Sequence, residues 1–167
     1  MRRMLCLLGL VIAIGGCESD TTGTSGGGTG PSGGGSSSAM SARIDGQSWG
    51  AAPSAISASN ITGVVTIVGA EAAGATSRAI TLTVVANTIG TYPIGAPPIN
   101  APATNAFLSA GSAQWAADTS RGSGFITLQT LNANGATGVF QFTAAPIVGT
   151  TASGDRVVTD GAFNVRF

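Results

Sequence analysis

Side chains alternate in polarity with a period of two over most of the chain that follows Met40. The segment Arg78–Ala86 shows this most clearly, because Ile80, Leu82 and Val84 fall on one side and Thr81, Thr83 and Val85 on the other. Shorter runs repeat the pattern: Thr62–Val68, Phe125–Thr130, Val139–Thr143 and Phe163–Phe167. Such alternation marks half-buried strands of an antiparallel sheet. It predicts an all-β domain, built as an antiparallel β-sandwich or partly open β-barrel of about 8–10 short strands.

Turn residues separate these runs. Asp-Gly and Asn-Gly pairs supply the positive φ angles that tight hairpins need. Asp45-Gly46 therefore predicts a hairpin between Ser41–Ile44 and Gln47–Ala51. The same argument predicts turns at Asn132–Gly135 and at Asp160-Gly161, the latter separating a strand Arg156–Thr159 from a strand Ala162–Phe167. The stretch Gly95–Asn105, with three prolines, is expected to be a loop, and no helical pattern of useful length is visible.

The N-terminus carries the parts of a secretory leader. Arg2 and Arg3 precede an apolar run from Leu5 to Ile14, which closes with Ile14-Gly15-Gly16-Cys17. These residues resemble the lipobox of a bacterial lipoprotein signal peptide, in which the leader is cleaved before the Cys and that Cys is acylated. The alternatives are an ordinary cleaved signal and an uncleaved anchor, but a membrane-spanning helix needs about 20 apolar residues, roughly twice this run. We expect residues 1–16 to be the signal peptide and Cys17 to be the lipidated residue, carrying palmitate-type chains.

Residues 17–39 follow as an acylated Cys and a linker. Thr21 to Ser38 is Gly, Ser and Thr with a single Pro, and such a composition cannot bury enough apolar surface to order itself. Two glycine motifs inside it, G-x-G-x-x-G and G-x-S-x-G, lack the flanking strand and helix that their chemistry requires. The domain is therefore expected to span residues 40–167. We expect Cys17 to tether it to the cell envelope, with the outer membrane as the favoured localisation.

Several later segments resemble a known family. Ala42-Arg43-Ile44-Asp45-Gly46-Gln47-Ser48-Trp49 resembles the opening A-x-I-D-G-x-x-W of a group of small bacterial lipoprotein domains of unknown function. The segments beginning at Gly90, Gly124, Gly138 and Gly161 are similar to its later parts, in the same order. The resemblance covers essentially everything beyond the linker. It implies a lipid-anchored all-β domain, and it brings no catalytic residues to carry over.

Composition narrows the chemistry further. His and Lys are absent, and from Met40 onward five Arg stand beside five acids, so the domain has no basic stripe for nucleic acid. Without His, or a Lys to serve as base, neither a Ser-His-Asp nor a Cys-His arrangement can form. Glu71 is the domain's only Glu, and no two acids form a recognisable glycosidase-like pair. We expect no enzyme activity, no cofactor and no metal site.

Aromatic residues are the remaining candidates for binding. Trp115 and Tyr92 are the residues that a binding surface would use, since aromatic faces stack on sugars and anchor partners. Packing inside the core is the competing interpretation for both, and Trp49 is expected in the core. The leading hypothesis is a non-enzymatic, lipid-anchored domain with an unknown protein or glycan partner or an envelope-structural role. The alternatives are a carbohydrate-binding module and a lipocalin-like small-molecule carrier.

Overall fold

The computed structural model describes residues 37–72, 74, 77–95 and 103–167. This part of the chain contains eleven strands, one 3-10 turn and no α-helix, so the all-β prediction is confirmed. The elements are β1 (Ala39–Ile44), β2 (Gln47–Gly50), η1 (Pro53–Ala55), β3 (Ile56–Ile61), β4 (Val64–Ala70), β5 (Arg78–Val85), β6 (Gly90–Ile94), β7 (Asn105–Ala110), β8 (Ala113–Ala117), β9 (Ser123–Asn132), β10 (Gly135–Pro146) and β11 (Arg156–Arg166).

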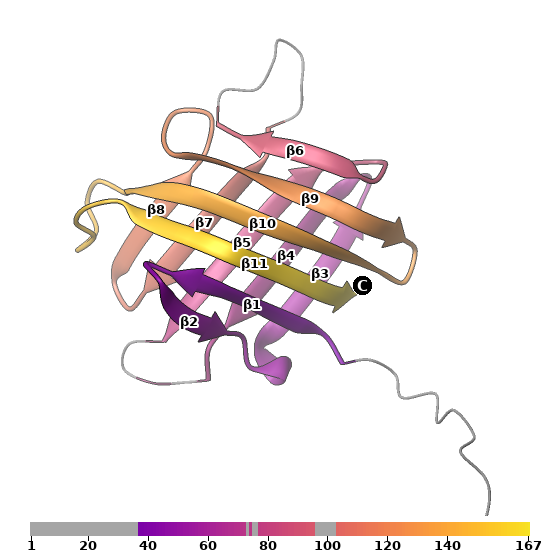
Figure 1. Ribbon diagram of the computed structural model, residues 1–167, viewed down its shortest axis with the longest axis horizontal. Helices are drawn as coiled ribbons and strands as arrows, with labels where there is room; N and C mark the ends of the chain where they lie inside the picture. The colour runs from indigo at the N-terminus through magenta and orange to yellow at the C-terminus, as the bar shows by residue number, and fades with distance from the viewer. Residues whose placement is uncertain (1–36, 73, 75–76, 96–102) are drawn as a thin grey trace, which may run out of the picture. The chain divides into compact units, whose positions relative to one another are not determined.

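The strands form two layers that one long strand joins. The front sheet, as Figure 1 shows it, has the order β2-β1-β11-β10-β9-β6, and the back sheet has the order β3-β4-β5-β7-β8. Strand β10 belongs to both, because its last residues Ala145 and Pro146 pair with Ala116 and Trp115 of β8. All these strand pairs are antiparallel. The sheet therefore curls over itself on one side, as a partly open barrel does.

The count of strands exceeds the predicted range because several strands carry a weak alternation signal. Strand β3, with the sequence Ile-Ser-Ala-Ser-Asn-Ile, has little apolar content, and β7 and β8 are rich in Ala. The pairing of these strands depends on the strands beside them in the sheet rather than on an alternation of polarity in their own sequences. The loop predicted over Gly95–Asn105 is shorter at its far end, since Asn105 already begins β7; residues 96–102 lie outside the described part.

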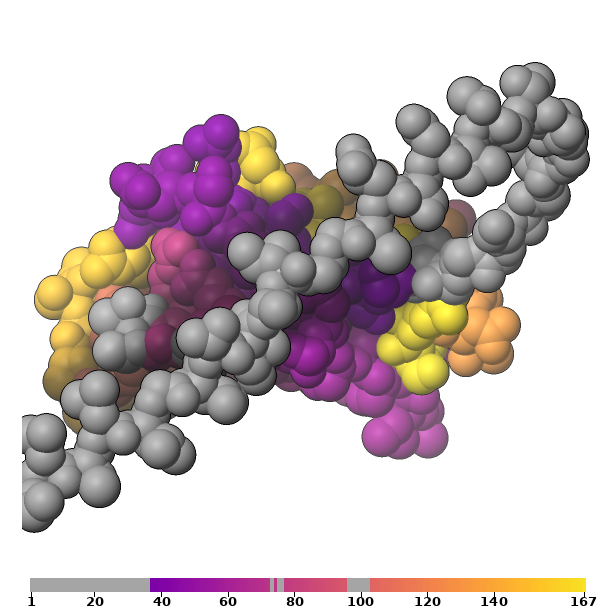
Figure 2. Space-filling model, turned by 90° about the horizontal axis from the view of Figure 1, so that it is seen from below, coloured from indigo at the N-terminus to yellow at the C-terminus, as the bar shows by residue number. Residues whose placement is uncertain are grey.

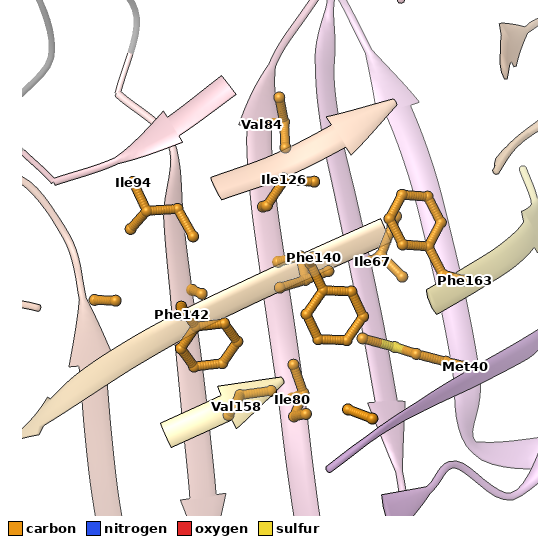
Figure 3. Packing of buried hydrophobic residues seen from close by; sticks show 14 of the residues in the cluster. Met40, Ile67, Ile80, Val84, Ile94, Ile126, Phe140, Phe142, Val158 and Phe163 are labelled. Atoms are coloured by element: carbon orange, nitrogen blue, oxygen red, sulfur yellow. The ribbon is translucent and has the colours of Figure 1, made fainter. Parts of the chain in front are cut away.

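The core lies between the two sheets and consists of the residues that the alternation placed on the inner side. Ile80, Leu82 and Val84 of β5 are buried, as are Val65 and Ile67 of β4. They face Ile126, Leu128, Phe140 and Phe142 of the front sheet, and Figure 3 shows several of these side chains meeting between the layers. Each such side chain contributes about 1.5–3 kcal/mol when it leaves water.

Three phenylalanines fill the middle of this core, and two of their rings lie over glycines. Phe140 stacks against Phe142 and Phe163, with ring centroids 6.3 and 6.4 Å apart. Phe163 is directly opposite Gly138, and Phe140 is directly opposite Gly161. A Cβ atom added at either glycine would lie 2.6 Å from an atom of the facing ring. The glycines therefore make room for aromatic rings that close the interior.

The hairpins test the turn predictions one by one. Asp45 and Gly46 connect β1 to β2 with φ angles of 51° and 78°, as predicted. Asn132–Gly135 also forms a hairpin, but its turn is centred on Ala133 and Asn134. Neither Asn134 nor Gly135 has a positive φ; instead the Asn132 side chain stabilises the turn by accepting a hydrogen bond from the Asn134 amide (2.8 Å). Thr62 was expected within a strand; instead Thr62 and Gly63 form the β3–β4 turn, with φ angles of 50° and 84°.

The prediction for Asp160-Gly161 is wrong. These residues lie inside the single strand β11, which runs from Arg156 to Arg166 without a hairpin. Phe142 pairs with Val158 and Phe140 with Gly161, so β11 holds one extra residue at this point. Asp160 takes its positive φ of 52° in that bulge. A left-handed residue serves a bulge as well as a turn, and only the register tells them apart.

Both ends of the described chain lie at the same end of the domain. Ala39 of β1 pairs with Asn164 of β11, and the Arg166 amide donates to the Ser38 hydroxyl (3.2 Å). The Phe167 amide donates to Asn134 (3.2 Å), and Figure 2 shows the yellow C-terminus beside the orange β9–β10 turn. From Ala39, β1 leads away over six residues, or about 20 Å. The β1–β2 turn therefore lies far from the point where the chain enters the domain.

Candidate functional site

The lipidation residue predicted from the sequence, Cys17, lies outside the described residues, as do the leader and nearly all of the linker. No helix in the described segments is both long enough and apolar enough to cross a bilayer. The acylation of Cys17 stays a prediction.

Trp115 does not present its ring to solvent. Only 4% of the residue is exposed, and the indole nitrogen donates to the Gly154 carbonyl (2.8 Å). The Arg156 guanidinium lies 4.8 Å from the ring centroid, in cation–π distance. The structure therefore places Trp115 in the core, where packing accounts for it, and not on an aromatic binding surface.

Tyr92 lies on the other sheet, and its ring packs against the edge of the core. It is opposite the buried Ile126, and its hydroxyl donates to the Thr88 carbonyl (2.7 Å). Since Tyr92 comes from β6 of the front sheet and Trp115 from β8 of the back sheet, the two side chains do not form one surface. Tyr92 caps the core at its rim.

The β1–β2 turn forms a polar corner, which we call the corner latch: Asp45, Arg156, Glu71 and Arg78. Asp45 pairs with Arg156 (Oδ2 to Nη1, 2.8 Å) and accepts a hydrogen bond from the Val157 amide (2.9 Å). Partial burial acts to raise the pKa of Asp45, but the Val157 hydrogen bond and the Arg156 charge outweigh it and lower that pKa below 3.8. The turn of β1–β2 is thereby fastened to the start of β11.

Glu71 and Arg78 form the second half of the corner latch. Their side chains make a two-point contact, Nη2 to Oε1 at 2.6 Å and Nε to Oε2 at 3.0 Å, and the Arg78 amide also donates to Glu71. The hydrogen bonds from the Arg78 side chain are the main cause that lowers the pKa of Glu71. Arg78 further donates to the Ser48 carbonyl and accepts from the Trp49 indole through its own carbonyl (3.3 and 3.2 Å).

The corner latch explains the A-x-I-D-G-x-x-W segment in physical terms. Ala42 and Ile44 face the core, and Asp45-Gly46 makes the turn. Trp49 is buried over Gly69, where an added Cβ would lie 3.3 Å from the indole. Each of the five fixed residues of the segment thus has a structural role.

A cleft of about 180 Å³ opens beside the corner latch, lined by Ile44, Asp45, Gln47, Arg78, Leu108, Ala110, Trp115 and Arg156. Two guanidinium groups reach it, but each is paired with a carboxylate. The charge of the cleft is therefore balanced by the protein itself.

Asp118 and Asp160 are also held by neighbouring side chains. Asp118 accepts hydrogen bonds from the Ser120 hydroxyl and amide and from Arg121, which lower its pKa, and Asp160 lies 3.6 Å from Arg43. A general acid needs a raised pKa near neutrality. Three of the acids show the opposite shift. Within the described ranges, no three His, Cys, Asp or Glu side chains gather as metal ligands would.

The outer side of the back sheet carries no charged side chain within its five strands, and we call it the neutral face. The strand registers place on it the following residues, none of them ionisable: Ser57, Ser59, Ile61, Val64, Thr66, Val68, Ala70, Ala79, Thr81, Thr83, Val85, Asn105, Phe107, Ser109, Gln114 and Ala116. The outer side of the front sheet differs, since Arg43, Asp160 and Arg166 lie there.

Phe107 stands out on the neutral face because 40% of it is exposed. It is opposite Thr81 of β5. Ala79, Thr81, Phe107, Leu108, Ser109 and Gln114 line a groove of about 260 Å³ beside the ring. Sequence reasoning missed this residue, because Ala106-Phe107-Leu108 is a continuous apolar run that does not reveal which side chain faces outward.

The comparisons with known proteins agree with the family resemblance at the level of the domain. A family model described as a domain of unknown function (DUF6252) matches residues 36–165. No curated protein and no solved structure matches the chain. The chain therefore belongs to the DUF6252 family of domains of unknown function.

Proposed function

We propose that this chain is a membrane-anchored bacterial lipoprotein whose β domain binds a partner and carries out no catalysis. The anchor is supported by the leader and the lipobox-like residues that end at Cys17. The linker that follows would enter the domain at Ala39, beside the C-terminus. The corner latch and its cleft lie at the other end of β1.

The observation that carries the binding role is the contrast between the acids and the neutral face. Four acids are engaged by arginines, at distances from 2.6 to 3.6 Å. A carboxylate held in this way is stable as an anion and is a poor proton donor. The neutral face, by comparison, offers an uncharged surface with a groove and one exposed aromatic ring. This arrangement favours recognition over acid–base chemistry.

A lipocalin-like carrier receives no support from the interior. Such a carrier needs a lined cavity between its sheets. Phe140, Phe142 and Phe163 occupy the middle of that space, together with the Ile, Leu and Val side chains of both layers. The grooves that we describe open at the corner and on the outer surface.

Fatty-acid labelling in a bacterial host tests the anchor. We expect labelled palmitate to be incorporated into the full-length chain and to be lost in Cys17→Ala, because the thiol is the acylation site. Cys6→Ala is the matched control, since Cys6 lies within the leader and would leave with it. Undiminished labelling of Cys17→Ala, or an unlabelled wild-type chain in the soluble fraction, would contradict the proposal.

A further inference from the structure

We propose that the neutral face binds a neutral glycan chain, with Phe107 as its stacking platform. This inference rests on the proposed binding function and names the class of partner. The groove beside Phe107 is bordered by the hydroxyl groups of Thr81 and Ser109 and by the amide of Gln114. Sugars present one apolar C–H face and a rim of hydroxyl groups. An aromatic ring suits the first, because the face of its π-system is negative, and hydroxyl and amide side chains suit the second.

The absence of ionisable side chains from the neutral face decides the charge of the ligand. An acidic glycan, a phosphorylated ligand or an anionic lipid surface would be recognised by Arg or Lys. Of the arginines whose contacts we describe, Arg43, Arg78 and Arg156 lie in the corner latch or on the front sheet. Arg121 lies just beyond the end of β8, where it is paired with Asp118. A neutral partner can be desolvated against this face without leaving a charge unpaired.

A protein partner fits the neutral face less well. Protein interfaces concentrate binding energy in Trp, Tyr and Arg, whereas Ser, Thr and Val are under-represented among their energetically dominant residues. Ser, Thr, Val and Ala predominate on the neutral face, and Phe107 lies near the middle of the β5–β7 pair. The face is also small. Five strands of about six residues span roughly 24 by 20 Å, or about 480 Å², below the roughly 800 Å² that each partner buries in a stable protein complex.

The position of the groove favours a polymer over an enclosed small molecule. It lies on the outer surface of the sheet, between side chains of β5, β7 and β8, and no second layer of the described chain covers these outward side chains. One sugar unit would rest against Phe107 while the neighbouring units extend across the strands.

The test uses the full-length chain, purified from its host membrane in detergent. We would measure its binding by isothermal titration calorimetry to three neutral polysaccharides, laminarin, dextran and galactomannan, and to polygalacturonate as the charged counterpart. We expect at least one neutral polysaccharide to bind and polygalacturonate to bind more weakly. Raising the salt concentration should leave the neutral binding unchanged, because no charge pair contributes to it.

Substitutions locate the site. Phe107→Ala should weaken binding about tenfold, corresponding to about 1.4 kcal/mol, whereas Phe107→Tyr keeps the ring and should bind within about twofold of wild type. Phe167→Ala is the matched control, because Phe167 is 36% exposed at the C-terminus and away from the neutral face. The melting temperature of each variant checks that it is folded.

Three outcomes would overturn the inference: no binding to any of the neutral polysaccharides, a preference for polygalacturonate, or neutral binding that Phe107→Ala leaves intact. Failure of the inference is separable from failure of the proposed anchor, because fatty-acid labelling at Cys17 reports on the anchor without any glycan.

Discussion

Asp45 has two structural roles, one in its backbone and one in its side chain, and both depend on its position in the β1–β2 turn. Its backbone adopts a φ of 51°, which Asp and Asn tolerate better than most residues that have a Cβ. Its carboxylate holds Arg156 and the Val157 amide of β11, which lies more than 100 positions later in the chain. The turn therefore both reverses the chain between β1 and β2 and connects it to the start of β11.

Two substitutions separate the backbone role of Asp45 from the role of its carboxylate. Asp45→Asn keeps the tolerance for positive φ and loses the charge, so we expect it to lower the free energy of unfolding by about 1 kcal/mol, a modest value because the pair is about one-third exposed. Asp45→Ala loses both, and we expect about 2 kcal/mol. Urea unfolding measures each, with Asp155→Asn, at an exposed acid, as the control. Equal losses of unfolding free energy in the two Asp45 variants would show that only the carboxylate contacts contribute to stability.

Strand β11 shows how an element can be specified by small residues as much as by large ones. It stays continuous through a bulge at Asp160, and Gly161 then lets the Phe140 ring lie against the strand backbone. Rings that cover a glycine in a sheet shield its backbone and replace the missing side-chain contacts. The aromatic packing of the core thus depends on a residue that contributes no side chain.

Gly161→Ala tests this arrangement. The new Cβ would lie 2.5 Å from the Phe140 carbonyl oxygen and 2.6 Å from two atoms of the Phe140 ring, and this residue is buried and has little room to move. We expect a loss of about 2–3 kcal/mol in the free energy of unfolding, as for other overpacked cores. Gly50→Ala is the control, since no atom lies within 4 Å of its added Cβ, and it should be neutral or slightly stabilising. A Gly161→Ala variant as stable as wild type would contradict this account of the core.

At the scale of the whole molecule, charge acts mainly through acids held by arginines. The pKa values of Asp45, Glu71 and Asp118 are all lower in the folded protein than the ordinary values of 3.8 for Asp and 4.5 for Glu. The unfolded chain therefore takes up protons at a higher pH than the folded one, and acid favours unfolding. The chain contains no His, the side chain that ordinarily titrates between pH 5 and 8.

We expect the free energy of unfolding to be nearly constant from about pH 6 to 8, where His would otherwise titrate. It should then fall as the pH drops below about 4.5, by roughly 2 kcal/mol in total, because the pairs are partly exposed and screened. Urea unfolding curves collected across this range measure the effect. A maximum of stability below pH 4 would contradict the assigned ion pairs.

Much of the fold could be predicted because strand periodicity is a local property. The faces of Arg78–Val85 and of Val139–Thr143 followed from alternation alone, and the Asp45-Gly46 hairpin followed from the φ angles that its residues prefer. The prediction failed at Asp160-Gly161 and at Thr62, where the same local preference fits more than one structure. The outward position of Phe107, and the choice between packing and a surface role for Trp115, could not be predicted for a similar reason, since short Ala-rich strands do not show which side faces inward.

The sequence by itself determined that this chain forms an antiparallel β domain with Ile, Leu, Val and Phe inside, because a period of two assigns side chains to faces without reference to the rest of the molecule. Only the tertiary structure decided which strands are neighbours, where β11 takes its bulge, that Trp115 lies beneath Arg156, and that one whole sheet face carries no charge. Those features arise from the register between strands that are distant in sequence, and such a register is set by the packing of the complete core.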